Sequence, residues 1–196
     1  MFGVCTGCML FVLVWESVIS GLVAHATGVL GLVSISIPIP RKIAERVRRE
    51  AEKLGLSLEG YVVELLVQSL DPKDRALEYI EAAKELLLQA RVELGKGDLR
   101  QAAEKMWGAT ALAIKAFAEW REGKRVSSHR ELWEYKDVVA NELGEWVRDS
   151  WNAGNSMHTC FYEGWCTRAD VEKNLAKIEK LVREIEARIK KQSGEH

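Results

Sequence analysis

Apolar residues recur at helical spacing from residue 71 to residue 191, and short turns interrupt them at regular intervals. Asp71 and Pro72 favour a helix start, because aspartate caps the first amides and proline fits the first helical turn. The sequence Gly-Lys-Gly-Asp at 95–98 ends that helix, and Asp98 can cap the next one. The whole chain of 196 residues holds only three prolines. The sequence therefore predicts a mostly α fold, an up-down helical bundle over residues 71–191 followed by a solvated tail at 192–196.

The later helices of this bundle carry their own start and stop signals. Ser128 and Glu131 are spaced as a capping box, and Thr167 can cap the last helix. Gly144 and Gly164 are predicted to bound the helix between them. The helix that follows Asp98 is predicted to present one apolar face, made of Leu99, Ala102, Met106, Ala109, Ala113, Phe117 and Trp120.

Residues 34–70 are predicted to form a strand, a helix, a turn and a second helix. Isoleucines alternate with small residues over 34–40, Gly55 ends the first helix, and Ser57 caps the second. Such a short segment cannot enclose a core, and its lone strand leaves unpaired edges. Pairing the strands of two copies removes both problems, so this segment predicts a homodimer.

The segment 34–70 resembles a ribbon-helix-helix module, the fold of many small antitoxins and repressors. The resemblance implies a transcriptional regulator whose outward strand residues read DNA. Those positions here are Ser34, Ser36 and Pro38, which cannot make bidentate contacts to base edges. Dimerisation is therefore favoured over DNA reading for this segment.

The first 33 residues form an apolar extension with a single charged side chain, Glu16. Three interpretations stay open: translated sequence upstream of a start near Val29 or Val33, a membrane helix within residues 9–40, or a buried helix. A membrane helix would leave the rest of the chain in the cytoplasm, because Arg41 and Lys42 follow it. Otherwise the cysteine content favours a cytoplasmic protein.

Composition and motifs limit the chemistry that the chain can carry. Lys and Arg number 28 against 29 Asp and Glu, so any contact with RNA or DNA would rest on a local patch. Cys5 and Cys8 have the spacing of half a zinc site, but no second pair follows, and we expect no metal. No nucleotide-binding loop is present, and we expect no cofactor. Cys160 and Cys166 could form a disulfide or remain free thiols.

Three stretches, "LRQAAEKMWGATALAIKAFAEW", "SHRELW" and "MHTCFYEGW", resemble the archaeal PaREP family over most of residues 71–185. That family is similar to HEPN domains, which implies a HEPN-like helical bundle. HEPN domains include ribonuclease toxins, partners of small nucleotidyltransferases, and inert dimerisation modules. Ribonuclease HEPN proteins carry an Arg and a His four to six residues apart on one helix.

His158 is the residue on which the catalytic question depends, with Arg148 and Tyr162 as its candidate partners. Arg148 lies ten positions before His158, about 15 Å along a helix and about 80° around it. This spacing departs from the ribonuclease pattern. His158 is predicted to be either a hydrogen-bonded core histidine or a half-buried base beside Asn155 and Tyr162.

Glu104, Lys105, His129 and Asn155 are candidate binding residues. Glu104 and Lys105 could lie on a solvated helix face, or Glu104 could contact a neighbouring helix. A cleft that joins Glu104, His129 and His158 is conceivable in a bundle.

The sequence therefore predicts a dimeric interaction or regulatory protein without enzymatic activity, in a toxin–antitoxin or mobile-element setting. A nucleotidyltransferase, a toxin or an antitoxin is the partner that this setting implies. The alternatives are a HEPN-type ribonuclease or nucleotide-binding protein that uses His158, and a DNA-binding regulator acting through residues 34–70.

Overall fold

The computed structural model describes residues 25–26, 33–34 and 38–193, and it divides into two units, 1–44 and 45–196. In the first unit, two short strands, β1 (His25–Ala26) and β2 (Val33–Ser34), pair antiparallel, with His25 opposite Ser34. Most of the apolar extension, including Cys5 and Cys8, lies outside the described residues. Within the described part of the chain, no helix is both long and apolar enough to cross a bilayer.

The strand predicted over residues 34–40 is wrong for the part that the structure describes. Ser34 ends β2, and residues 38–40 have no regular secondary structure. Pro38 and Pro40 explain this difference, because a proline has no N–H group to donate to a strand ladder. The strand of the dimerisation ribbon is therefore not supported. Its two helices are present as α1 (Arg41–Leu54) and α2 (Leu58–Leu66).

The second unit is mostly α, as predicted, and its helix boundaries follow the capping residues. Ser57 accepts a hydrogen bond from the amide of Gly60 at the start of α2, and Asp71 accepts from Lys73 and Asp74. Ser128 and Glu131 form the predicted capping box. The remaining helices are α3 (Pro72–Lys96), α4 (Leu99–Glu122), α5 (His129–Leu143), α6 (Trp146–Glu163) and α7 (Arg168–Ser193).

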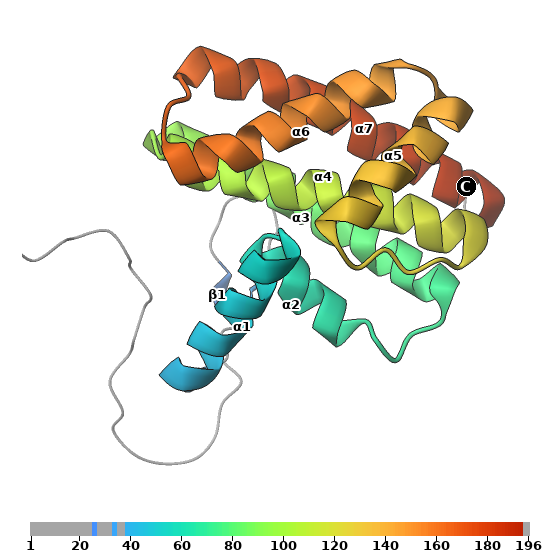
Figure 1. Ribbon diagram of the computed structural model, residues 1–196, viewed down its shortest axis with the longest axis horizontal. Coiled ribbons are helices and arrows are strands. Elements are labelled where there is room, and N and C mark those ends of the chain that lie inside the picture. Colours follow the sequence, from blue (N-terminus) through green and yellow to red (C-terminus); the bar gives the residue numbers. More distant parts are fainter. Residues whose placement is uncertain (1–24, 27–32, 35–37, 194–196) are drawn as a thin grey trace, which may run out of the picture. The chain divides into compact units, whose positions relative to one another are not determined.

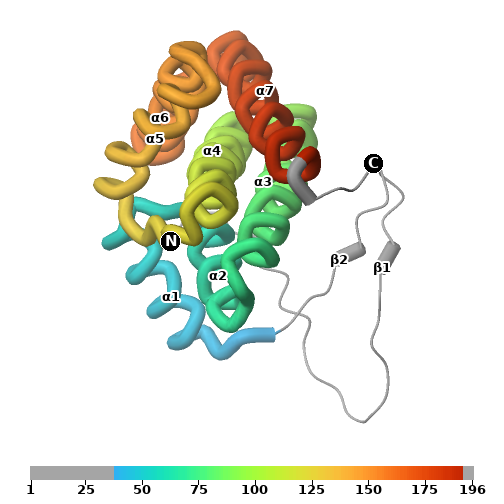
Figure 2. Tube along the Cα trace, turned by 90° about the vertical axis from the view of Figure 1, so that its right-hand side faces the viewer, coloured from blue at the N-terminus to red at the C-terminus, as the bar shows by residue number. Residues whose placement is uncertain are grey.

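Helix α4 occupies the centre of this unit, between α3 on one side and α6 and α7 on the other (Figure 1). Seen along the bundle in Figure 2, α4 is enclosed by α3, α5, α6 and α7. Its side chains are buried on every face between residues 102 and 119, except at Lys105. The predicted single apolar face is therefore incomplete. Alanines and Gly108 explain the difference, because small side chains let several helices approach one helix closely.

Gly154 sets the approach of α6 to α4. A Cβ atom at Gly154 would lie 2.4 Å from the hydroxyl oxygen of Thr110 on α4. Thr110 is fully buried and donates to the carbonyl of Met106 at 2.9 Å. Any side chain at position 154 would push the two helices apart.

A buried ionic cluster joins α2 to the bundle. The carboxylate of Glu64 on α2 accepts from the ammonium of Lys115 on α4 and, at 2.9 Å, from the hydroxyl of Tyr79 on α3. Arg125 lies 3.7 Å from the other carboxylate oxygen. Burial lowers the pKa of Lys115, although the charge of Glu64 opposes this shift. This cluster could not be predicted from the sequence, because Lys115 and Glu64 are 51 positions apart.

Candidate functional site

Two histidines from different helices meet over one buried tryptophan. His158 of α6 stacks on Trp107 of α4, with ring centroids 4.7 Å apart and an interplanar angle of 30°. His129, the first residue of α5, lies 5.2 Å from Trp107 and 5.6 Å from His158. Trp107 is fully buried, and both imidazole rings pack against its indole ring.

The two histidines belong to a longer series of aromatic rings, which we call the ring row: Trp133, His129, His158 and Tyr162. Neighbouring centroids along this row lie 6.4, 5.6 and 5.2 Å apart. Trp133 is 39% exposed and Tyr162 is 49% exposed. The row is therefore an aromatic strip that begins and ends at the surface.

His129 is a neutral imidazole with a defined tautomer. The indole N–H of Trp133 donates to Nε2 of His129 at 2.9 Å, so Nε2 carries no proton and Nδ1 carries it. Burial lowers the pKa of His129, and a hydrogen bond with Asn155 offsets part of this effect. Asn155, predicted as a binding residue, thus supports His129 from α6.

His158 is a neutral imidazole that lacks a hydrogen bond at one nitrogen. Burial, and then the nearby His129, lower the pKa of His158 to about 4. Its Nδ1 atom is buried and has no partner among the described residues. His158 is thus half-buried beside Tyr162, and its buried Nδ1 atom lacks the hydrogen bond expected of a core histidine.

Glu104 is buried on α4, one turn before Trp107, and not on a solvated face. Burial raises its pKa to about 7, and the charge of Glu59 adds to this shift, while Lys105 and the amide of Leu58 oppose it. One carboxyl oxygen of Glu104 has no partner among the described residues. Lys105 instead pairs with Glu59 of α2. The predicted contact of Glu104 with a neighbouring helix is therefore present, and it is made to α2.

Arg148 takes no part in this site. Its guanidinium binds Asp137 at 3.0 Å and also pairs with Glu145, in the first turn of α6. His158 lies ten residues further along the same unbroken helix, about 15 Å away by helical rise. The Arg–His pair of the ribonuclease alternative is not assembled within this chain.

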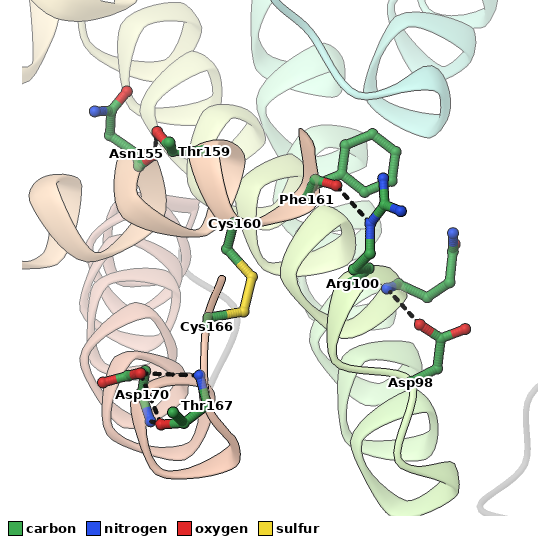
Figure 3. The surroundings of a disulfide bond; sticks show 10 residues. Asp98, Arg100, Asn155, Thr159, Cys160, Phe161, Cys166, Thr167 and Asp170 are labelled. Atoms are coloured by element: carbon green, nitrogen blue, oxygen red, sulfur yellow. Dashed lines mark hydrogen bonds between the residues drawn. A yellow bond between two sulfur atoms is a disulfide. The ribbon is translucent and has the colours of Figure 1, made fainter. Parts of the chain in front are cut away.

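A disulfide between Cys160 and Cys166 joins the end of α6 to the start of α7 (Figure 3). Of the two states that the sequence left open for these cysteines, the structure has the bonded one. The guanidinium of Arg100 donates to the carbonyl of Phe161 at 2.8 Å beside it. These contacts hold the end of α6 that carries Tyr162.

Trp107, Trp133 and Gly55 are parts of the site that the sequence did not single out. A Cβ at Gly55 would lie 2.9 Å from both Cβ and Nδ1 of His129, so the α1–α2 turn rests directly on that ring. The positions of the two tryptophans carried a signal, since Trp107 follows Glu104 by three residues and Trp133 follows His129 by four. The described residues contain no group of three His, Cys, Asp or Glu side chains that could hold a metal ion.

The fold and this site define a helical-bundle protein with a histidine pair set among aromatic rings. Its sequence places it more narrowly: the model of the archaeal PaREP1/PaREP8 family matches residues 78–182, and the chain belongs to this family. Every site residue from Glu104 to Tyr162 falls within the matched segment, whereas Gly55 lies before it. No curated protein and no solved structure matches the chain.

Proposed function

We propose that this protein is a HEPN-like regulatory module that acts as a homodimer. It acts by binding a partner protein and does not cleave RNA. The observation that carries the proposal is the state of the ring row. Burial lowers the pKa of both histidines, His158 stacks on Trp107, Arg148 is bound elsewhere, and the end rings of the row are partly exposed. Partly exposed aromatic rings are typical of contact surfaces between proteins.

Toxin–antitoxin or mobile-element association is the setting that we propose for this module, with a nucleotidyltransferase, a toxin or an antitoxin as its partner. The family membership supports this setting through the likeness of the family to HEPN domains. A partner gene of one of these classes beside the gene for this protein would support the same conclusion.

We expect light scattering during size-exclusion chromatography to give twice the chain mass of 22.1 kDa. Replacing both Trp133 and Tyr162 by serine removes the exposed ends of the ring row and is expected to yield a monomer. Trp165→Ser is the matched control, because Trp165 is 52% exposed but lies outside the ring row. A monomeric wild-type protein, or a double variant that stays dimeric, would contradict the proposed interface.

One observation favours a second candidate, a ribonuclease. His129 and His158 lie 5.6 Å apart, and two imidazoles at such a separation can act as base and acid on either side of a phosphodiester. In this arrangement His129, and not Arg148, is the catalytic partner of His158. The lowered pKa values of both histidines weaken the candidate, because neither ring would carry the proton that an acid must donate at neutral pH.

Purified protein incubated with total RNA is expected to leave it intact at pH 7, and His158→Ala is expected to behave in the same way. Electrophoresis of the RNA provides the measurement. Cleavage by the wild-type protein that disappears in the His158→Ala variant would establish the ribonuclease candidate instead. Cleavage that persists in the variant would point to a contaminating nuclease.

A further inference from the structure

The turn between α1 and α2, with the first two residues of α2, covers one side of the histidine site. We call residues 55–59 the lid. The carbonyl of Gly55 accepts a hydrogen bond from the indole N–H of Trp107 at 3.2 Å. The Cα of Gly55 rests on His129, since a Cβ there would lie 2.9 Å from the ring nitrogen Nδ1. The lid therefore shields Trp107 and one side of the His129 ring from solvent.

Polar contacts hold most of the lid in place. The amide of Leu58 donates to the carboxyl of Glu104, and Glu59 pairs with Lys105. Leu56 is its one large apolar side chain buried in the core. The lid leads into α2, a nine-residue helix that is too short to be stable alone and that Glu64 anchors to Lys115 of α4 beyond the lid.

We propose that the lid opens as a unit without unfolding of the bundle, and that opening exposes His129 and the carboxyl group of Glu104. The proposal rests on the contacts of the lid and does not depend on whether the protein dimerises or binds RNA. In the closed state Gly55 packs against the Nδ1 side of the His129 ring, whose other nitrogen accepts from Trp133. The lid is thus a gate to the histidine site.

Charges around Glu104 couple the gate to pH. Glu59 on α2 repels an ionised Glu104, Lys105 on α4 attracts it, and Tyr162 on α6 and Glu52 on α1 lie on the same side of the site. The raised pKa of Glu104 means that the closed state retains a proton that the open, solvated state releases. Opening is therefore favoured as pH rises from the ordinary carboxyl range through 7, and it levels off above that.

Amide hydrogen exchange of the full-length protein tests this gate. The amide of Leu58 donates to the carboxyl of Glu104 on α4, so it loses its partner when the lid opens and reports that opening. After correction for intrinsic exchange, we expect the opening constant of this amide to rise about fivefold to tenfold between pH 6 and 7.5. In Glu104→Gln this rise is expected to fall below about twofold.

A second pair of variants tests the fit of the lid on His129. Gly55→Ala is expected to increase opening at every pH by about tenfold or more, because the new methyl group collides with His129. Gly97→Ala is the matched control: Gly97 also has a positive φ, 82° against 66°, but nothing lies within 4 Å of its Cβ position. We expect Gly97→Ala to leave exchange of the lid amides unchanged.

Two results would overturn the gate. The first is exchange of the lid amides at the same rate as the core amides of α4, which would show that the lid opens only with global unfolding. The second is a pH-dependent rise in opening that persists in Glu104→Gln.

Discussion

Replacement of Lys115 by methionine is expected to lower the free energy of unfolding by about 3–5 kcal/mol, which is the cost of breaking a buried ion pair. Lys115 is 1% exposed and Glu64 is 8% exposed, so water cannot replace the lost partner of the carboxylate. Methionine fills a similar volume, so the loss reports the unpaired charge more than a cavity. Urea denaturation measures it, and the melting temperature should fall by about 6–20 °C.

Two further variants separate the charge of Lys115 from its packing. The double variant Lys115→Met, Glu64→Gln removes both charges and keeps an acceptor for the Tyr79 hydroxyl, so it should recover most of the loss. Lys84→Met is the surface control, because Lys84 pairs with Glu81 and Glu186 on an exposed face and should cost at most about 1 kcal/mol. A loss at Lys115 no larger than the loss at Lys84 would show that the cluster is solvated.

Helix boundaries could be predicted from the sequence because their causes are local. A capping side chain such as Asp71 or Ser128 acts on amides two or three residues away, and Gly97 ends α3 through its own backbone conformation. The family could likewise be recognised from the short stretches around Trp107, His129 and His158. Both the helix boundaries and the family therefore depend on residues that are close together in the sequence.

The predictions that failed required knowledge of distant contacts. The periodicity of α4 indicates an amphipathic helix, but the surrounding helices bury all of its faces, including Glu104 and Lys115. The pattern over residues 34–40 is that of a strand, yet the two prolines within it cannot donate to a ladder. Glu104, His129 and His158 could be chosen as candidates from the sequence because each belongs to a stretch shared with the family. The lid lies outside those stretches, and only the three-dimensional arrangement reveals it.

Glu104 and His158 are expected to give opposite pH dependences to folding stability. The pKa of Glu104 is about 7 in the folded protein against an ordinary value of 4.5, so the folded state holds an extra proton between these values. The contribution of Glu104 to folding stability is therefore present below about pH 4.5 and is lost as the pH rises to 7. The pKa of His158 is about 4 against an ordinary 6.5, so between these values the unfolded chain holds the extra proton. Its contribution therefore grows as pH rises from 4 to 6.5.

These two contributions oppose each other between pH 4.5 and 6.5, so each is measured as the difference in stability between wild type and a variant that lacks that group. Relative to wild type, Glu104→Gln should gain about 3 kcal/mol of stability between pH 4.5 and 7.5, because a buried carboxylate no longer has to ionise. His158→Phe keeps a ring stacked on Trp107 and should gain about 1–3 kcal/mol relative to wild type as pH falls from 7 to 4. Urea denaturation of the three proteins at four pH values measures both differences, and all other titrating groups cancel in them. If neither difference varies with pH, both groups are solvated in the folded protein. The neutral histidine pair, the pH dependence of lid opening and the argument against acid–base catalysis at pH 7 would then all have to be abandoned.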